Sequence, residues 1–96
     1  MKAYLVLDLT IHDLPRFMEY IERIPELIKK HGGRYIVQGT QPSVVEGDWH
    51  PERLVIIEFP SKGSAEYFLQ DPEAKALFAI RHQTTVSKLV LVEGNS

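Results

Sequence analysis

Apolar residues alternate with other residues in several short segments, which predicts β-strands. In residues 3–9 (AYLVLDL), the apolar residues at odd positions alternate with Tyr4, Val6 and Asp8. Residues 53–59 and 88–92 repeat this period and are rich in Val, Ile and Leu. A fourth strand is predicted over residues 34–38, followed by a bulge or turn over 39–43 and a short continuation over 44–46.

Apolar residues at helical spacing predict helices between these strands. Asp13 is the expected N-cap of the first helix, and Gly32-Gly33 is its expected stop, a chain reversal that needs positive φ. The apolar stripe of this helix is Leu14, Phe17, Met18, Ile21, Ile24 and Ile28. Pro25 lies inside the pattern and should kink or divide the helix. A second helix is expected in two pieces, over 62–69 and 72–83, because Asp71-Pro72 is typical of an N-cap followed by a first-turn proline.

The resulting order is β-α-β-β-α-β, which indicates an α+β class and a ferredoxin-like fold. We therefore expect one domain over residues 1–96, with a four-stranded antiparallel sheet and two helices on one face.

The strands are apolar on both faces, although two helices can cover only one face. An antiparallel sheet with one face in water should carry polar residues on that face. The uncovered face is expected to hold Tyr4, Val6, Leu54, Ile56 and Glu58. A second copy of the chain would cover it, so we predict a homodimer packed sheet to sheet, a dimeric α+β barrel. The alternative is a monomer in which these side chains partly face water.

Composition narrows the functional classes. The 96 residues include 11 Lys+Arg, 13 Asp+Glu and no Cys, with a net charge of −2. Disulfides, thiolate catalysis and Cys-based zinc sites are excluded, and the charge gives no sign of a nucleic-acid partner. No apolar run approaches a membrane span, so a cytoplasmic protein is expected. The spacing of His12, His31, His50 and His82 does not suit a metal site, and no cofactor motif is present.

A set of short motifs stands in order along nearly the whole chain. They are His31-Gly32-Gly33-Arg34-Tyr35, Glu46-Gly47-Asp48-Trp49, Pro51, Arg53, Glu58-Phe59-Pro60-Ser61, Asp71-Pro72, Arg81 and Val92-Glu93-Gly94. With these motifs the chain resembles a widespread bacterial family, domain of unknown function 1330. The resemblance implies the dimeric α+β barrel fold but brings no reaction, because the family has no established one. The wider fold group includes cofactor-independent monooxygenases, muconolactone isomerases and haem-binding enzymes. Any activity inferred from these enzymes rests on fold analogy only. Family members often carry a Tyr where this chain has Ala74.

Two arginines are the main candidates for ligand binding. Arg53 shares strand parity with Val55, and Arg81 follows Phe78 on an apolar helix stripe, so both should point between helices and sheet from the same end. A guanidinium group among apolar walls matches a carboxylate or phosphate. Trp49, on the adjoining loop, could close the mouth of such a pocket. The alternative is structural, with each arginine paired to a carboxylate of the chain or reaching water.

Asp8 and His31 are weaker candidates for proton transfer. Asp8 and Glu58 face the uncovered side, where burial would raise a carboxyl pKa; the alternative is a salt bridge between subunits. Histidine is a common proton-transfer group, but His31 also suits the C-terminal cap of the first helix.

These features predict a small dimeric protein that binds a small organic acid. If the protein is an enzyme, it is expected to act on this acid without a metal or a bound cofactor. The alternative is a non-catalytic dimerising structural or accessory module, and a haem or flavin binder would be recognised by its colour. The volume of a cavity between the helices and the sheet distinguishes the acid-binding protein from the structural module, because a ligand site needs an enclosed space. A structural module should fill the space between helices and sheet with Phe17, Ile21, Phe68, Leu77 and Phe78.

Overall fold

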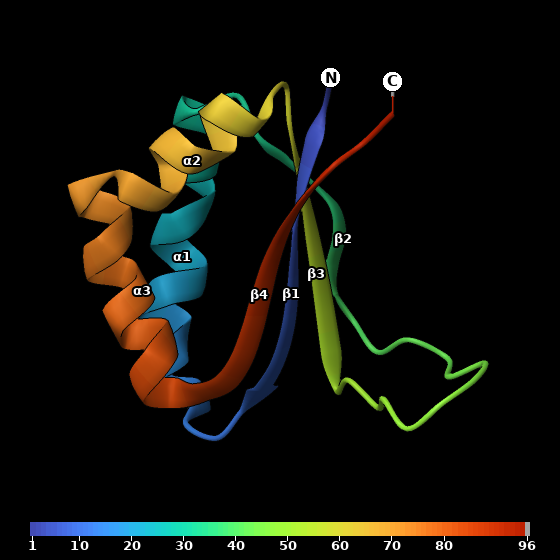
Figure 1. Ribbon diagram of the computed structural model, residues 1–96. Helices are drawn as coiled ribbons and strands as arrows, with labels where there is room; N and C mark the ends of the chain where they lie inside the picture. Colours follow the sequence, from blue (N-terminus) through green and yellow to red (C-terminus); the bar gives the residue numbers. More distant parts are fainter. Residues whose placement is uncertain (96) are drawn as a thin grey trace.

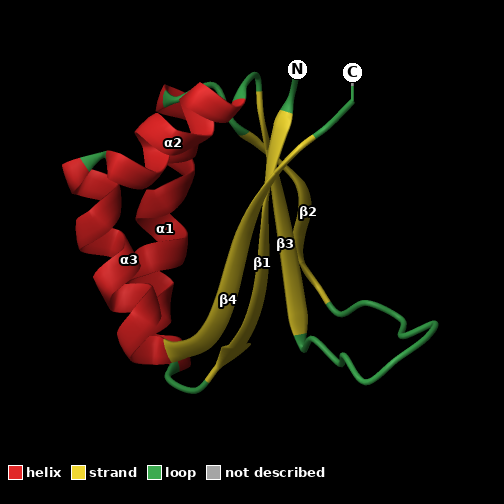
Figure 2. Ribbon diagram, viewed as in Figure 1, coloured by secondary structure: helices red, strands yellow, loops and turns green. Residues whose placement is uncertain are grey.

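A computed structural model describes residues 1–95 as two layers, a layer of helices and a sheet (Figures 1 and 2). The elements in chain order are β1 (Ala3–Ile11), α1 (Leu14–Lys30), β2 (Arg34–Thr40), β3 (Arg53–Phe59), α2 (Lys62–Gln70), α3 (Pro72–Thr84) and β4 (Thr85–Glu93). All three helices lie on the same face of the sheet (Figure 1). The other face, which we call the open face, is covered by no helix.

The sheet has the strand order β2-β3-β1-β4, and every neighbouring pair is antiparallel. Leu5 of β1 lies opposite Ile57 of β3 and Leu91 of β4, so apolar residues of three strands meet on the helix side. This topology confirms the predicted ferredoxin-like α+β fold, with the second helical segment in two pieces.

Side-chain caps explain where the helices begin. Asp13 accepts a hydrogen bond from the backbone N–H of Arg16 at the start of α1, and Ser61 accepts one from Ser64 at the start of α2. Asp71 accepts from the N–H of Glu73 and begins α3, with Pro72 as its first residue. These caps satisfy N–H groups that have no partner inside the helix.

Pro25 is expected to kink or divide α1, and the division is wrong because one helix runs from Leu14 to Lys30. Proline removes one backbone donor from a helix interior. Ile24, Leu27 and Ile28 are nevertheless buried around this position. The packing of this apolar stripe keeps both halves of α1 in one helix.

Several strand boundaries also differ from the prediction. Residues 44–46 form no strand; they belong to a loop over 41–52 that projects beyond the open face (Figure 1). Valines favour strands only where a neighbouring strand can pair with them, and Val45 is 90% exposed. Conversely, β4 begins at Thr85, directly after α3, and extends the pairing with β1 to Ile11.

The two glycines after α1 have different roles. Gly32 has φ +81° and makes the chain reversal. Gly33 has no positive φ, contrary to expectation; it is required because a Cβ would lie 2.7 Å from Phe59 Cε1 and 2.9 Å from Ile28 Cγ2. The close approach of α1 to the end of β3 therefore depends on the missing side chain.

In the described residues 1–95, none of the helices combines the length and apolar character needed to cross a membrane.

Candidate functional site

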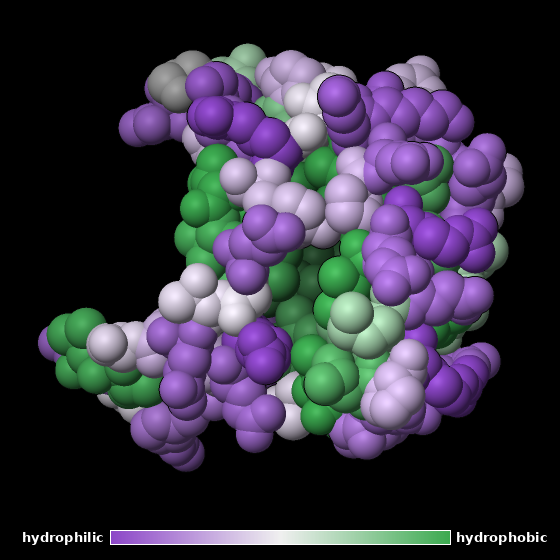
Figure 3. All heavy atoms as spheres, turned by 180° about the vertical axis from the view of Figure 1, so that it is seen from behind, coloured by the Kyte–Doolittle hydropathy of each residue, from purple (hydrophilic) through white to green (hydrophobic). Residues whose placement is uncertain are grey.

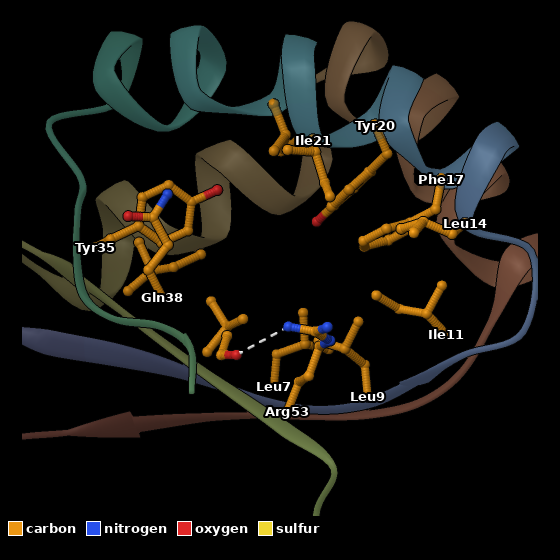
Figure 4. A pocket seen from close by; sticks show the side chains of 14 residues that line it. Leu7, Leu9, Ile11, Leu14, Phe17, Tyr20, Ile21, Tyr35, Gln38 and Arg53 are labelled. Carbon is orange, nitrogen blue, oxygen red and sulfur yellow. Dashed lines mark hydrogen bonds between the residues drawn. The ribbon is translucent and has the colours of Figure 1, made fainter. Parts of the chain in front are cut away.

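A cavity of about 340 Å³ lies between α1 and the sheet (Figure 4). It is lined by Leu7, Leu9, Ile11, Leu14, Phe17, Tyr20, Ile21, Ile24, Tyr35, Gln38, Gly39, Arg53, Val55 and Ile57. Figure 3 shows a recess with hydrophobic walls between the helix layer and the sheet. Phe17 and Ile21 therefore line a space that they were expected to fill in a purely structural module.

Arg53 reaches this cavity from the first position of β3. It lies opposite Leu9 of β1, on the helix side of the sheet. Its Nη1 donates a long hydrogen bond of 3.4 Å to the Gly39 carbonyl (Figure 4). Within residues 1–95 no carboxylate forms a salt bridge with it. Its side chain is exposed, so the guanidinium group is accessible to an anion in the cavity.

Arg81 does not line the same cavity. It is only 4% exposed and donates a hydrogen bond of 2.8 Å to the Ser87 hydroxyl. Its guanidinium carbon lies 6.0 Å from the ring centroid of Tyr20 and 5.4 Å from that of Phe78. The two arginines are thus not brought together, but Arg81 contacts the cavity indirectly because Tyr20 lines it.

Trp49 lies on the open-face side and not at the mouth of the cavity. Its indole N–H donates a hydrogen bond of 2.8 Å to Asp8. Trp49 also lines a separate, smaller depression together with Leu54 and residues of the 41–52 loop. Asp8 and Trp49 therefore form a local pair that attaches this loop to β1.

His31 lies at the C-terminal end of α1, away from the cavity. Its Nε2 is 2.8 Å from the Asp71 carboxylate, and Lys30 Nζ is 3.1 Å from the same oxygen. Hydrogen bonds from His31 first, then from Lys30 and the Glu73 N–H, hold the pKa of Asp71 well below its usual value. This arrangement connects the end of α1 to the junction of α2 and α3, and it matches the capping alternative for His31.

Glu58 has partners within its own chain. Arg34 Nε donates a hydrogen bond of 3.0 Å to Glu58, and Lys2 lies 3.5 Å from the same oxygen. The hydrogen bond from Arg34 is the main reason that the pKa of Glu58 is lowered, not raised as expected for a carboxyl group on this face. Charge pairing outweighs burial here.

The expected open-face residues lie where the register predicts. Tyr4 pairs with Glu58, Val6 with Ile56, and Asp8 with Leu54, all on the face away from the helices. These side chains are half-buried in the single chain. Val86, Val90 and Val92 of β4 are exposed. The open face therefore has a broad apolar area without a cover.

Sequence reasoning missed three polar side chains of the cavity: Tyr20, Tyr35 and Gln38. Tyr20 is spaced for the apolar stripe of α1, so helical periodicity could have placed it. Tyr35 faces the helices opposite Ile57, but β2 has register shifts on both sides of the segment from Val37 to Gln38. Simple alternation therefore does not place Gln38 on the helix side.

Within residues 1–95, no cluster of three or more His, Cys, Asp or Glu side chains is arranged to hold a metal ion.

The fold and the cavity define a ferredoxin-like α+β protein whose open space lies between its helices and its sheet. Over residues 2–95 the chain matches the family described as domain of unknown function 1330 (DUF1330), and it belongs to that family. A search among curated proteins finds no match.

Solved structures with low sequence identity share the fold. A protein of unknown function from Rhodopseudomonas palustris has 17% identity and a TM-score of 0.78, covering 99% of this chain and 83% of its own. A dimeric ferredoxin-like protein of unknown function from Jannaschia sp. CCS1 has 13% identity and a TM-score of 0.73, with 98% and 100% covered. SnoaB, a cofactor-independent oxygenase from Streptomyces nogalater, has 12% identity and a TM-score of 0.65, with 99% and 94% covered.

Proposed function

We propose that this chain is a homodimeric protein that binds a small organic acid in the cavity between α1 and the sheet. The observation that carries the proposal is a cavity with mainly hydrocarbon walls and one accessible guanidinium group, that of Arg53. Pockets of a few hundred Å³ with few polar groups are typical of small-molecule sites. A guanidinium fork can donate one hydrogen bond to each oxygen of a carboxylate.

The proposal favours ligand binding over the purely structural alternative. A structural module gains stability by filling the space between helix and sheet, since empty apolar space sacrifices packing contacts. This chain instead leaves about 340 Å³ open next to Phe17 and Ile21. Such a space is costly unless a ligand uses it.

The dimer is proposed from the open face. Val6, Leu54 and Ile56 form part of its apolar area, and the 41–52 loop extends from the same side with hydrophobic residues at its end (Figure 3). The Jannaschia protein with the same fold is described as dimeric. A second copy packed on this face would cover both the strands and the exposed Val45.

A thermal-shift and calorimetric screen of small carboxylates, phosphates and aromatic acids tests the ligand. A ligand at a hundred times its Kd should add about 2.7 kcal/mol, which is several degrees for a domain of this size. The stabilisation should be lost in Arg53→Met and kept in Arg23→Met. Arg23 is the matched control because it is an exposed arginine of α1 that pairs with Glu19 and does not line the cavity.

If no acid stabilises the protein, or if Arg53→Met binds as well as the wild type, the proposed ligand class is wrong. The non-catalytic dimerising module would then be the better interpretation. Any acid that binds should also be tested for oxygen consumption, because SnoaB is described as an oxygenase that works without a cofactor.

A further inference from the structure

Every polar side chain that lines the cavity can donate a hydrogen bond, and the described part of the chain contributes no carboxylate to it. Its polar side chains are Tyr20, Tyr35, Gln38 and Arg53, and among residues 1–95 no Asp, Glu or His lines it. The Gly39 carbonyl, which also borders the cavity, already accepts from Arg53. Arg53 can only donate, and the phenols and the Gln38 amide can donate as well, so a ligand with more than one acceptor oxygen finds several partners in this lining.

The two phenol groups retain their protons at neutral pH. Burial raises the pKa of Tyr20, and burial is also the main cause that raises the pKa of Tyr35. Both groups are therefore neutral donors, which suits them to an oxygen that carries negative charge or partial negative charge.

Tyr20 differs from Tyr35 because a buried cation lies beside it. The Arg81 guanidinium packs near the Tyr20 ring, and its charge and hydrogen bonding partly offset the rise in the Tyr20 pKa. Arg81 is almost fully buried, and its Nε has no hydrogen-bond partner within residues 1–95. No carboxylate of that part of the chain forms a salt bridge with it. A buried charge without a carboxylate partner is costly, and here that charge opposes the rise in the Tyr20 pKa that burial causes.

The two walls of the cavity present different donors. Tyr20 extends from α1 and Arg53 from β3, and both polar ends point into the space between the helix and the sheet (Figure 4). If Arg53 binds the carboxylate of a ligand, the rest of that ligand lies against Phe17, Ile24 and Tyr20.

We propose that Tyr20 donates a hydrogen bond to a second oxygen of the bound acid, and that Arg81 is the positioning residue behind it. The ligand class is then a small oxo, enol or phenol acid: a largely hydrocarbon frame with a carboxylate for Arg53 and a second acceptor oxygen for Tyr20. This inference rests on the proposed acid-binding function and narrows it to one kind of acid.

The test compares two acids of the same shape, cyclohexanecarboxylate and 4-oxocyclohexanecarboxylate, by isothermal titration calorimetry. The added carbonyl oxygen is an acceptor only. Wild-type protein should bind the oxo acid roughly three- to tenfold more tightly, the effect of one hydrogen bond. Tyr20→Phe should remove this preference and leave the affinity for cyclohexanecarboxylate unchanged. Tyr35→Phe, which removes the other phenol oxygen of the cavity, is the matched control and should retain the preference.

The role of Arg81 is tested on the same preference. The preference for the oxo acid should decrease in Arg81→Met and be retained in Arg81→Lys, which keeps the positive charge beside Tyr20. A structural role alone would change the unfolding temperature and not the ratio of the two affinities.

The outcomes separate this inference from the proposed function. If both acids bind equally and Arg53→Met abolishes both, the acid site stands and the role of Tyr20 is wrong. A preference that survives in Tyr20→Phe, or disappears in Tyr35→Phe instead, also overturns the inference. Binding of neither acid to the wild-type protein overturns the inference together with the proposed function.

Discussion

Single residues at the end of α1 decide how the helix layer joins the sheet. His31 and Lys30 both contact Asp71, which also caps α3. Gly33, two positions after His31, packs without a side chain against Phe59 and Ile28. The conspicuous His-Gly-Gly segment is therefore accounted for by packing and capping, away from the cavity.

The low pKa of Asp71 makes part of the stability depend on pH. The folded pKa lies below the ordinary value of 3.8, so the unfolded chain binds the proton more readily as the solution becomes acidic. The stabilisation is complete above that ordinary value and is lost as the pH falls through the folded one. Asp71→Asn keeps a capping residue but removes the charge. It should lower the free energy of unfolding at pH 6, and the difference from wild type should shrink toward pH 3 in urea titrations.

Asp13→Asn is the control for this experiment. Asp13 caps α1 as Asp71 caps α3, but within residues 1–95 it forms no salt bridge. Its substitution should give a much smaller effect at pH 6. A constant difference between Asp71→Asn and wild type across the acid range would contradict the ion-pair explanation.

Gly33→Ala tests the close approach of α1 and β3. The new methyl group would lie within 3 Å of both Phe59 and Ile28, a separation that real Cβ atoms essentially never show. We expect a loss of about 1–3 kcal/mol in the free energy of unfolding, as for other overpacked cores. Gly63→Ala is the matched control, because only Ser61 Oγ at 3.8 Å is near its Cβ position in α2. It should be neutral or stabilising by up to about 1 kcal/mol. Equal effects of the two substitutions would show that space at Gly33 is not limiting.

At the scale of elements, α1 and the sheet enclose a cavity instead of a fully packed interface. The helix contributes Phe17, Tyr20 and Ile24 to one wall, and β3 contributes Arg53 and Val55 to the other. The apolar stripe of α1 thus has two functions, since part of it packs into the core and part of it faces the open space.

Val55→Ile measures whether this space is open in solution. The substitution adds one methylene group at a half-buried strand position that lines the cavity. Filling empty apolar space should raise the free energy of unfolding by up to about 0.8 kcal/mol, and it should weaken the binding of any acid found in the screen. In a closely packed core the same change would cost about 1–3 kcal/mol. Destabilisation of that size would argue against an open cavity.

At the scale of the whole molecule, the open face is the main uncovered surface. Ile56→Asp places a charge among Val6, Val37 and the other apolar residues of that face. An unpaired charge in a dry interface is costly, so the variant should be monomeric or insoluble. Light scattering over a range of concentrations measures the change in mass.

Tyr67→Asp is the control for the dimer experiment. Tyr67 is an exposed aromatic residue of α2 on the helix layer, so the same charge there should leave the mass unchanged. The emission of Trp49, the single tryptophan, gives a second readout, because this residue contacts Asp8 on the open-face side. An Ile56→Asp protein that remains a well-folded dimer would rule out sheet-to-sheet association.

The sequence by itself determined the order of elements, the caps and the two faces of the sheet. These features depend on local rules: alternation in strands, a 3.6-residue period in helices, and polar caps such as Ser61 and Asp71. Alternation also sufficed to place Arg53 on the helix side and Asp8 on the open face.

Only the tertiary structure decided which polar groups share a site. The register shifts in β2 bring Gln38 beside the cavity, and the packing of α3 places Arg81 behind Tyr20 instead of next to Arg53. The charged side chains that pair with Glu58 and Asp71 come from segments 24 to 56 positions away along the chain. Such contacts depend on how whole elements pack. A local sequence pattern does not determine the distance between a helix and a sheet. That distance leaves room for a cavity here, and it makes Tyr20 and Arg53 the residues to test first.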